Sequence, residues 1–109
     1  MVLGAMPAAP PVAILTVSAG PDTGFRFRIK PTGIALLGRD SENDVVLNDP
    51  ATSRRHAQIQ FTNGSYVLTD LGSANGTIVN DQRIKERALS DGDVIKVGQD
   101  VMVASIKPT

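Results

Sequence analysis

The chain has 109 residues, 11 basic and 11 acidic side chains, one histidine and no cysteine, so its formal net charge is zero. This length suits one domain with a real core. Zero net charge and only three phenylalanines and one tyrosine argue against nucleic-acid binding. Without cysteine and with one histidine, neither a thiolate site nor a multi-histidine metal site is available, and we expect no metal and no cofactor.

The first 21 residues carry no charged side chain. They do not match an export signal or a membrane span, because Pro7, Pro10 and Pro11 interrupt the apolar run and no basic residue precedes it. We expect a flexible tail over residues 1–11, a domain over residues 12–107, and a cytoplasmic protein without membrane contact. The chain is also compatible with a domain cut from a longer, multidomain protein.

Short apolar segments between turn residues predict strands along the whole chain. The first is residues 12–18, which precedes Gly20-Pro21. Over residues 25–30, apolar and cationic side chains alternate, which predicts one buried face and one solvated row of cations, Arg26, Arg28 and Lys30. Further strands are predicted at residues 34–37, 45–47, 57–61, 66–68, 77–79, 94–97 and 101–106.

Turn residues separate these segments, and Asn63-Gly64 is the strongest hairpin signal among them. No segment has an apolar stripe at helical spacing over three turns. About eleven short strands therefore predict an all-β sandwich of two mainly antiparallel sheets, with binding loops gathered at one end.

Hydrogen-bond donors cluster in three of the turns, at residues 38–41, 52–56 and 73–77. A sandwich brings its loops together at its ends, so these turns can meet in space. Arginine offers a rigid fork for two phosphate oxygens, a serine hydroxyl donates to a third, and turn N–H groups add further donors. The combination predicts a site for a tetrahedral dianion.

These motifs, in this order, resemble the forkhead-associated (FHA) domain family. The resemblance is carried by Gly38-Arg39, by Ser53-Arg54-Arg55-His56 and by Asn75-Gly76-Thr77, with matching flanks at residues 44–47, 70–73 and 89–95. It implies an eleven-stranded sandwich that binds phosphothreonine peptides without catalysis. It also implies a phosphothreonine-containing partner protein and an upstream Ser/Thr protein kinase, and involves neither nucleic acid nor membrane.

The resemblance assigns roles by position. Arg39 and Ser53 would contact the phosphate, Arg54 would add charge beside it, and Asn75 would hold the peptide main chain. Four further polar residues would surround this set: Ser41, Thr52, Arg55 and Thr77. Three residues would shape the loops: Gly38, His56 and Gly76. One departure is Asn80-Asp81, where many members have Asn-Gly; aspartate can still adopt the positive φ of such a turn.

Other functions compete with this one. Ser53 and His56 could form a nucleophile–base pair, but no nucleophile elbow accompanies them. Asp91-Gly92-Asp93 lacks the spacing of a calcium loop. The main alternative is a phosphate-independent interaction scaffold that uses a sheet face. A phosphorylated residue near the start, such as Thr16, Ser18 or Thr23, could also bind back onto the loops.

Overall fold

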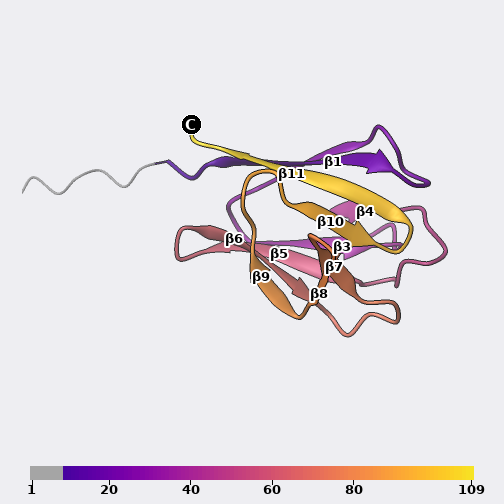
Figure 1. Cartoon of the computed structure of the whole chain (residues 1–109). Helices are drawn as coiled ribbons and strands as arrows, with labels where there is room; N and C mark the ends of the chain where they lie inside the picture. Colours follow the sequence, from indigo (N-terminus) through magenta and orange to yellow (C-terminus); the bar gives the residue numbers. More distant parts are fainter. Residues whose placement is uncertain (1–8) are drawn as a thin grey trace, which may run out of the picture.

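The computed structural model describes residues 9–109, which form eleven strands and no helix. The predicted tail over residues 1–11 lies mostly outside this described part. Figure 1 shows two layers of strands, with the C-terminus at one end of the sandwich. The prediction of an all-β sandwich with about eleven strands is confirmed.

One sheet has six strands in the order β2-β1-β11-β10-β7-β8. Every neighbouring pair in it is antiparallel, and the longest pairing joins β1 to β11, with a register shift between Val17 and Ala19. The bounds of its strands are β1 Val12–Ala19, β2 Arg26–Ile29, β7 Thr77–Val79, β8 Gln82–Ile84, β10 Val94–Val97 and β11 Asp100–Lys107.

The other sheet has five strands in the order β4-β3-β5-β6-β9. Its pairs are antiparallel except for β3 and β4, which run parallel, so the chain must loop back between these two strands. The bounds of its strands are β3 Ile34–Gly38, β4 Val45–Val46, β5 Ala57–Thr62, β6 Ser65–Asp70 and β9 Glu86–Ala88.

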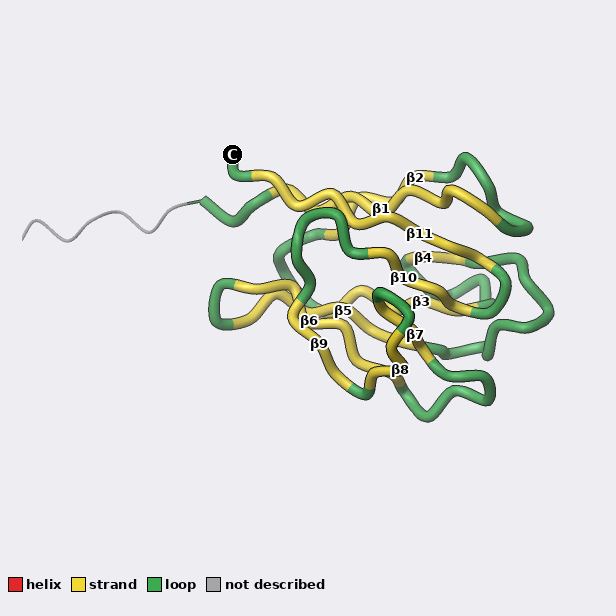
Figure 2. Tube along the Cα trace, viewed as in Figure 1, coloured by secondary structure: helices red, strands yellow, loops and turns green. Residues whose placement is uncertain are grey.

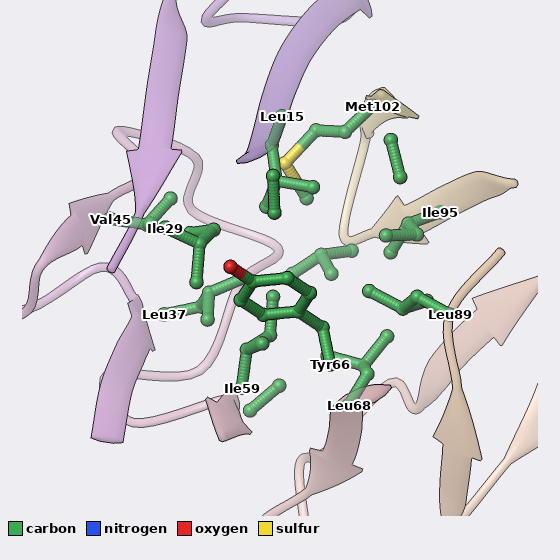
Figure 3. Close-up of a cluster of buried hydrophobic side chains, with 14 of the residues drawn as sticks. Leu15, Ile29, Leu37, Val45, Ile59, Tyr66, Leu68, Leu89, Ile95 and Met102 are labelled. Carbon is green, nitrogen blue, oxygen red and sulfur yellow. The ribbon is translucent and has the colours of Figure 1, made fainter. Parts of the chain in front are cut away.

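The core lies between the two sheets, where alternate residues of each strand point inward. Figure 3 shows the ring of Tyr66 among Leu37, Ile59 and Leu68 of its own sheet, opposite side chains of the six-stranded sheet. The Tyr66 hydroxyl donates a 2.6 Å hydrogen bond to the Pro11 carbonyl, so the one polar atom of this ring is satisfied at the core's edge.

The turns follow the sequence signals. Asn63 and Gly64 both have positive φ, at 50° and 81°, as a tight hairpin turn requires. Asn80 and Asp81 also have positive φ, at 50° and 66°, so aspartate takes the conformation that glycine has in many members. The Asn80 side chain supports the turn, because it donates to Asp93 and accepts from the Val94 N–H.

The alternation over residues 25–30 predicts that Phe25, Phe27 and Ile29 share one buried face, and this prediction is wrong for Phe25. Arg26 and Arg28 are exposed and Ile29 is buried, as the alternation predicts, but Phe25 is 57% exposed. Phe25 precedes β2 and stacks on Phe27, with ring centroids 6.3 Å apart, instead of entering the core.

Candidate functional site

The three donor-rich turns lie at the same end of the sandwich, away from the C-terminus (Figures 1 and 2). Backbone hydrogen bonds join them. The Arg39 N–H donates to the Ser53 carbonyl at 3.1 Å, and the Asp40 N–H donates to the Arg54 carbonyl at 3.2 Å. The Leu71 N–H donates to the His56 carbonyl at 2.9 Å. Segments far apart in the sequence therefore form one connected loop cluster, which we call the loop end: residues 38–44, 47–56 and 70–77.

Arg39 directly follows the last residue of β3 and is exposed. Its Nε donates a 3.2 Å hydrogen bond to the Thr52 carbonyl, which fixes the guanidinium beside the next loop. Neither terminal nitrogen has a partner among residues 9–109, so both can donate to a ligand. Gly38 allows the backbone to pack closely against the Arg54 carbonyl, because a Cβ at position 38 would overlap that oxygen. Gly38 thus lets the two loops pack closely, and Arg39 exposes its guanidinium at the surface beside them.

Ser53 is half-buried, and its side chain links the second loop to the third. Its Oγ accepts a 3.1 Å hydrogen bond from the Ala74 N–H. Because this bond uses a lone pair of the oxygen, the hydroxyl proton remains available to a ligand atom. Ser53 and Arg39 therefore present donors from adjoining backbone segments.

His56 is fully buried and connects the second and third loops. Its Nδ1 accepts a 3.1 Å hydrogen bond from the Ser53 N–H, so in the neutral ring Nε2 carries the proton and donates it to the Gly76 carbonyl at 2.8 Å. Both ring nitrogens are thereby occupied by backbone groups. The arrangement does not provide a base for the Ser53 hydroxyl, as a hydrolase would need.

Asn75 is exposed, and its Nδ2 donates to the Ala51 carbonyl at 2.8 Å. Its Oδ1 has no partner among residues 9–109 and can accept a main-chain N–H from a ligand. Gly76 adopts a φ of 83°, while Asn75 is not among the residues of positive φ. The glycine thus makes the turn, and the Asn75 side chain is held at the surface.

Two carboxylates that the sequence reading did not single out support these loops. Asp49 is fully buried and accepts hydrogen bonds from the N–H groups of Ala51 and Gln99, from the Gln99 side chain and from the Thr52 hydroxyl. Burial alone would raise the pKa of Asp49, but these hydrogen bonds hold its pKa below the ordinary value. An ionised Asp49 therefore holds the loop that presents Ser53.

Asp70 plays the same part for the third loop. It accepts hydrogen bonds from the Gly72 and Ser73 N–H groups, from the Ser73 hydroxyl at 2.5 Å and from the Thr77 hydroxyl at 2.7 Å. Burial opposes the charge, yet these donors lower the pKa of Asp70. The sequence pattern Asp70-x-x-Ser73 is typical of a turn in which the aspartate side chain accepts hydrogen bonds from the residues that follow it.

The remaining candidate residues divide by exposure. Ser41, Arg54 and Arg55 are exposed at the loop end and open to a ligand. Thr52 and Thr77 are buried, at 2% and 0% exposure, with their hydroxyls bonded to Asp49 and Asp70. The structure thus gives these two threonines supporting contacts inside the loops, not a surface for direct contact.

Two further carboxylates, Asp22 and Asp100, are buried next to each other. The Asp22 N–H donates to the Asp100 carboxylate at 2.9 Å, and one oxygen of each side chain lacks a partner within the described chain. Burial and the neighbouring Asp22 carboxylate raise the pKa of Asp100 to about 6. Near pH 6 this pair therefore begins to lose a proton at a buried position.

Arg39 and Ser53 present donor groups at the loop end, which suits an anion, and the exposed carboxylates of the loop end, Glu42 and Asp44, lie in its first segment. Hydrogen bonds to a charged group contribute about 1.5–3 kcal/mol each. Three or four of them, less the cost of ordering the ligand, leave room for micromolar affinity, about −8 kcal/mol, if main-chain contacts assist. Within the described chain no group of three histidine or acidic side chains is placed to hold a metal ion.

Comparison with protein families agrees with this geometry. The model of the FHA domain matches residues 35–98. The glycogen accumulation regulator GarA of Mycobacterium tuberculosis is 37% identical over 90 residues, which cover 83% of this chain and 55% of that protein. The oxoglutarate dehydrogenase inhibitor of Corynebacterium diphtheriae is 41% identical over 87 residues, which cover 79% and 59%. The chain thus spans just over half the length of these relatives.

Solved structures give the same result. An FHA domain from Arabidopsis thaliana superposes with a TM-score of 0.87 at 30% identity, covering 97% of this chain and 94% of that one. A structure from a study of phosphothreonine-dependent FHA domain interactions has a TM-score of 0.82 at 31% identity, covering 90% and 99%. The EmbR protein of Mycobacterium tuberculosis, in complex with a low-affinity phosphopeptide, has a TM-score of 0.79 at 32% identity, covering 90% and 25%.

Proposed function

We propose that this chain, which belongs to the FHA domain family, is a non-catalytic module that binds phosphothreonine-containing peptides in Ser/Thr-kinase signalling. Arg39 and Ser53 bind the phosphate, Arg54 adds positive charge beside it, and the Asn75 side chain holds the peptide main chain. Ser41 and Arg55 line the approach. Gly38, His56 and Gly76 keep the loops in place.

The single observation that carries this proposal is the way in which Arg39 and Ser53 are held. Both donors are fixed by hydrogen bonds to neighbouring loops, at 3.2 Å from Arg39 Nε and 3.1 Å to Ser53 Oγ. Neither bond uses the groups that would face a phosphate. A site whose donors are ordered before binding spends less free energy on ordering when the ligand arrives.

A titration of matched peptides tests the proposal. An oriented phosphothreonine peptide library first yields the preferred sequence, which is then synthesised with phosphothreonine and with plain threonine. We expect micromolar binding of the first peptide and no measurable heat from the second in isothermal titration. Equal affinity for both peptides would contradict the proposal. Affinity should also fall below about pH 6, where the phosphate gains a proton.

The wider biology is part of the same proposal. Residues 12–107 form the binding domain, the partner is a protein phosphorylated on threonine by an upstream kinase, and the protein acts in the cytoplasm. No helix long and apolar enough to cross a membrane occurs in residues 9–109. Because the matched relatives are longer, the proposed function concerns this binding domain, with or without neighbours in a larger protein.

A further inference from the structure

A row of outward-facing side chains crosses three neighbouring strands beside the loop end. In the antiparallel register, Ile78 of β7 lies opposite Lys96 of β10 on one side and opposite Arg83 of β8 on the other. We call these three residues the Lys96–Arg83 row. Directly paired residues share a face of the sheet, so an isoleucine lies between two cations.

The strand burial pattern places this row on the outer face of the sheet. Ile95, Val97 and Val79, which alternate with the row, are fully buried in the core. Lys96 and Arg83 are exposed, and Ile78 is half-buried. The row therefore forms an accessible strip with an apolar centre.

The row is continuous with the candidate phosphate site. A hollow of about 220 Å³ is lined by Ala51, Asn75, Gly76, Ile78, Lys96 and Gly98, so Asn75 belongs to both surfaces. On the other side, the Arg83 guanidinium lies against Gly76, where an added Cβ would lie 2.7 Å from Arg83 Nε. A peptide held by Asn75 thus has this strip next to it.

The charges of the row are uncompensated. Among residues 9–109, neither Lys96 nor Arg83 has an acidic side chain within ion-pair distance or a side-chain hydrogen bond. The residue that pairs with Lys96 on its other side is Val101, which is apolar. Two cations without counter-charges, separated by one isoleucine, are complementary to an anionic side chain with an aliphatic stem.

From this we infer that the Lys96–Arg83 row binds an anionic side chain of the phosphothreonine peptide, close in sequence to the phosphothreonine. The anion is a carboxylate or a second phosphate, and its stem packs on Ile78. The inference rests on the proposed function, since Asn75 must hold the peptide first. It names two residues outside the phosphate loops, Lys96 and Arg83, as determinants of peptide sequence.

A peptide scan tests the inference. Starting from the best phosphothreonine peptide, each flanking position is changed in turn to glutamate, glutamine, lysine and phosphoserine, and affinities are measured by fluorescence anisotropy. For the wild-type protein we expect one position, or two adjacent ones, at which glutamate binds at least about fivefold more tightly than lysine. Comparing the affinities of the glutamate and phosphoserine peptides shows whether the row prefers a carboxylate or a second phosphate.

Charge reversal supplies the second arm. We expect Lys96→Glu and Arg83→Glu each to abolish or reverse the preference at that position, while affinity for the glutamine peptide changes less than about threefold. Lys30→Glu makes the same change of net charge on another edge of the sandwich and should keep the wild-type preference. Arg39→Ala serves as the control that removes binding of every phosphothreonine peptide.

The outcomes separate the two proposals. Tight binding of phosphothreonine peptides with no preference for an anion at any position, or with a preference that Lys96→Glu leaves unchanged, overturns the inference and leaves the proposed function standing. A failure of the wild-type protein to prefer any phosphothreonine peptide over its threonine counterpart overturns both.

Discussion

The exposed arginines of β2 and those of the loop end differ in how their side chains are held. On β2, Arg26 and Arg28 project from an edge strand, and neither guanidinium donates a hydrogen bond within the described residues. At the loop end, Arg39 is tied through Nε to the Thr52 carbonyl. The same side chain is free in one region and oriented in the other.

The difference between these regions lies beneath the surface. The loop end is supported by two hydrogen-bonded carboxylates, the fully buried Asp49 and the half-buried Asp70, whereas among residues 9–109 neither Arg26 nor Arg28 is tied to a neighbouring loop by a side-chain hydrogen bond. Surface cations alone attract any anion weakly and are screened by salt. At the loop end, Asp49 and Asp70 fix the loops that carry Arg39 and Ser53, so these donors are oriented before a phosphate arrives.

Removing Arg39 should give the largest effect on binding. Arg39→Ala deletes a two-point contact with the phosphate, so we expect the affinity for the best phosphothreonine peptide to fall at least about thirtyfold, which corresponds to about 2 kcal/mol. Isothermal titration measures the change. Arg28→Ala, the matched deletion on β2, should change the affinity less than about twofold; a comparable loss there would favour the sheet-face scaffold.

Asp70 tests whether the support of the loops matters to the fold. Asp70→Ala leaves buried donors of Ser73 and Thr77 without an acceptor, so we expect about 2 kcal/mol of lost stability in urea unfolding and weaker peptide binding. Asp91→Ala provides the control, because Asp91 is exposed and water can replace its bonds to the Lys107 Nζ and to the Ile106 N–H. Its midpoint should stay close to that of the wild type.

Asp100 gives stability an unusual pH dependence. Its pKa is raised to about 6 in the folded protein from an ordinary 3.8, so the folded state holds a proton that the unfolded state has lost. Stability should therefore fall, by up to about 3 kcal/mol, as pH rises from about 4 to about 6. Asp100→Asn replaces the titrating carboxyl with a side chain that stays neutral, so thermal unfolding of this variant should show a flat profile across that range.

The effect of pH below this range has the opposite sign. Asp49 and Asp70 have lowered pKa values in the folded state, so their contribution to stability is present above pH 3.8 and is lost as pH falls further. We thus expect wild-type stability to be greatest near pH 4 to 5. A maximum at pH 7 or above would contradict this assignment of the buried carboxylates.

Ser53 should give a smaller effect on binding than Arg39. Ser53→Ala removes one hydroxyl donor to the phosphate and the acceptor for the Ala74 N–H, so we expect about a tenfold loss of affinity. Ser53→Thr retains the hydroxyl and should bind more tightly than the alanine variant. If the alanine and threonine variants bound equally well, a direct role for this hydroxyl would be wrong.

The strands that the sequence revealed are those with a buried face. Alternation or an apolar run marked β1, β5 and β10, whose inward residues are nearly all inaccessible. The strands β8 and β9 were not predicted individually, because each has three residues and is largely exposed, so burial imposes no pattern on it. The order of strands in each sheet depends on long-range pairing, which local patterns do not encode.

The residues of the site also differ in whether the sequence alone could reveal them. The donors Arg39, Ser53 and Asn75 were readable because they belong to turn motifs with a recognisable order. Asp49 was not, since its partners include Gln99, 50 residues away along the chain, and the bonds exist only after the sandwich closes. Supporting groups of this kind are specified by the tertiary structure and have little local signature.

Mapping the phosphopeptide onto the backbone amides is the most direct test of the central claim, that one anion is held by three converging loops. In ¹⁵N-resolved NMR titrations, we predict that the phosphothreonine peptide shifts amides in residues 38–41, 53–55 and 74–76, and that the unphosphorylated peptide does not. Shifts centred on Arg26 and Arg28 with Arg39 unmoved, or the same shifts from both peptides, would contradict the account.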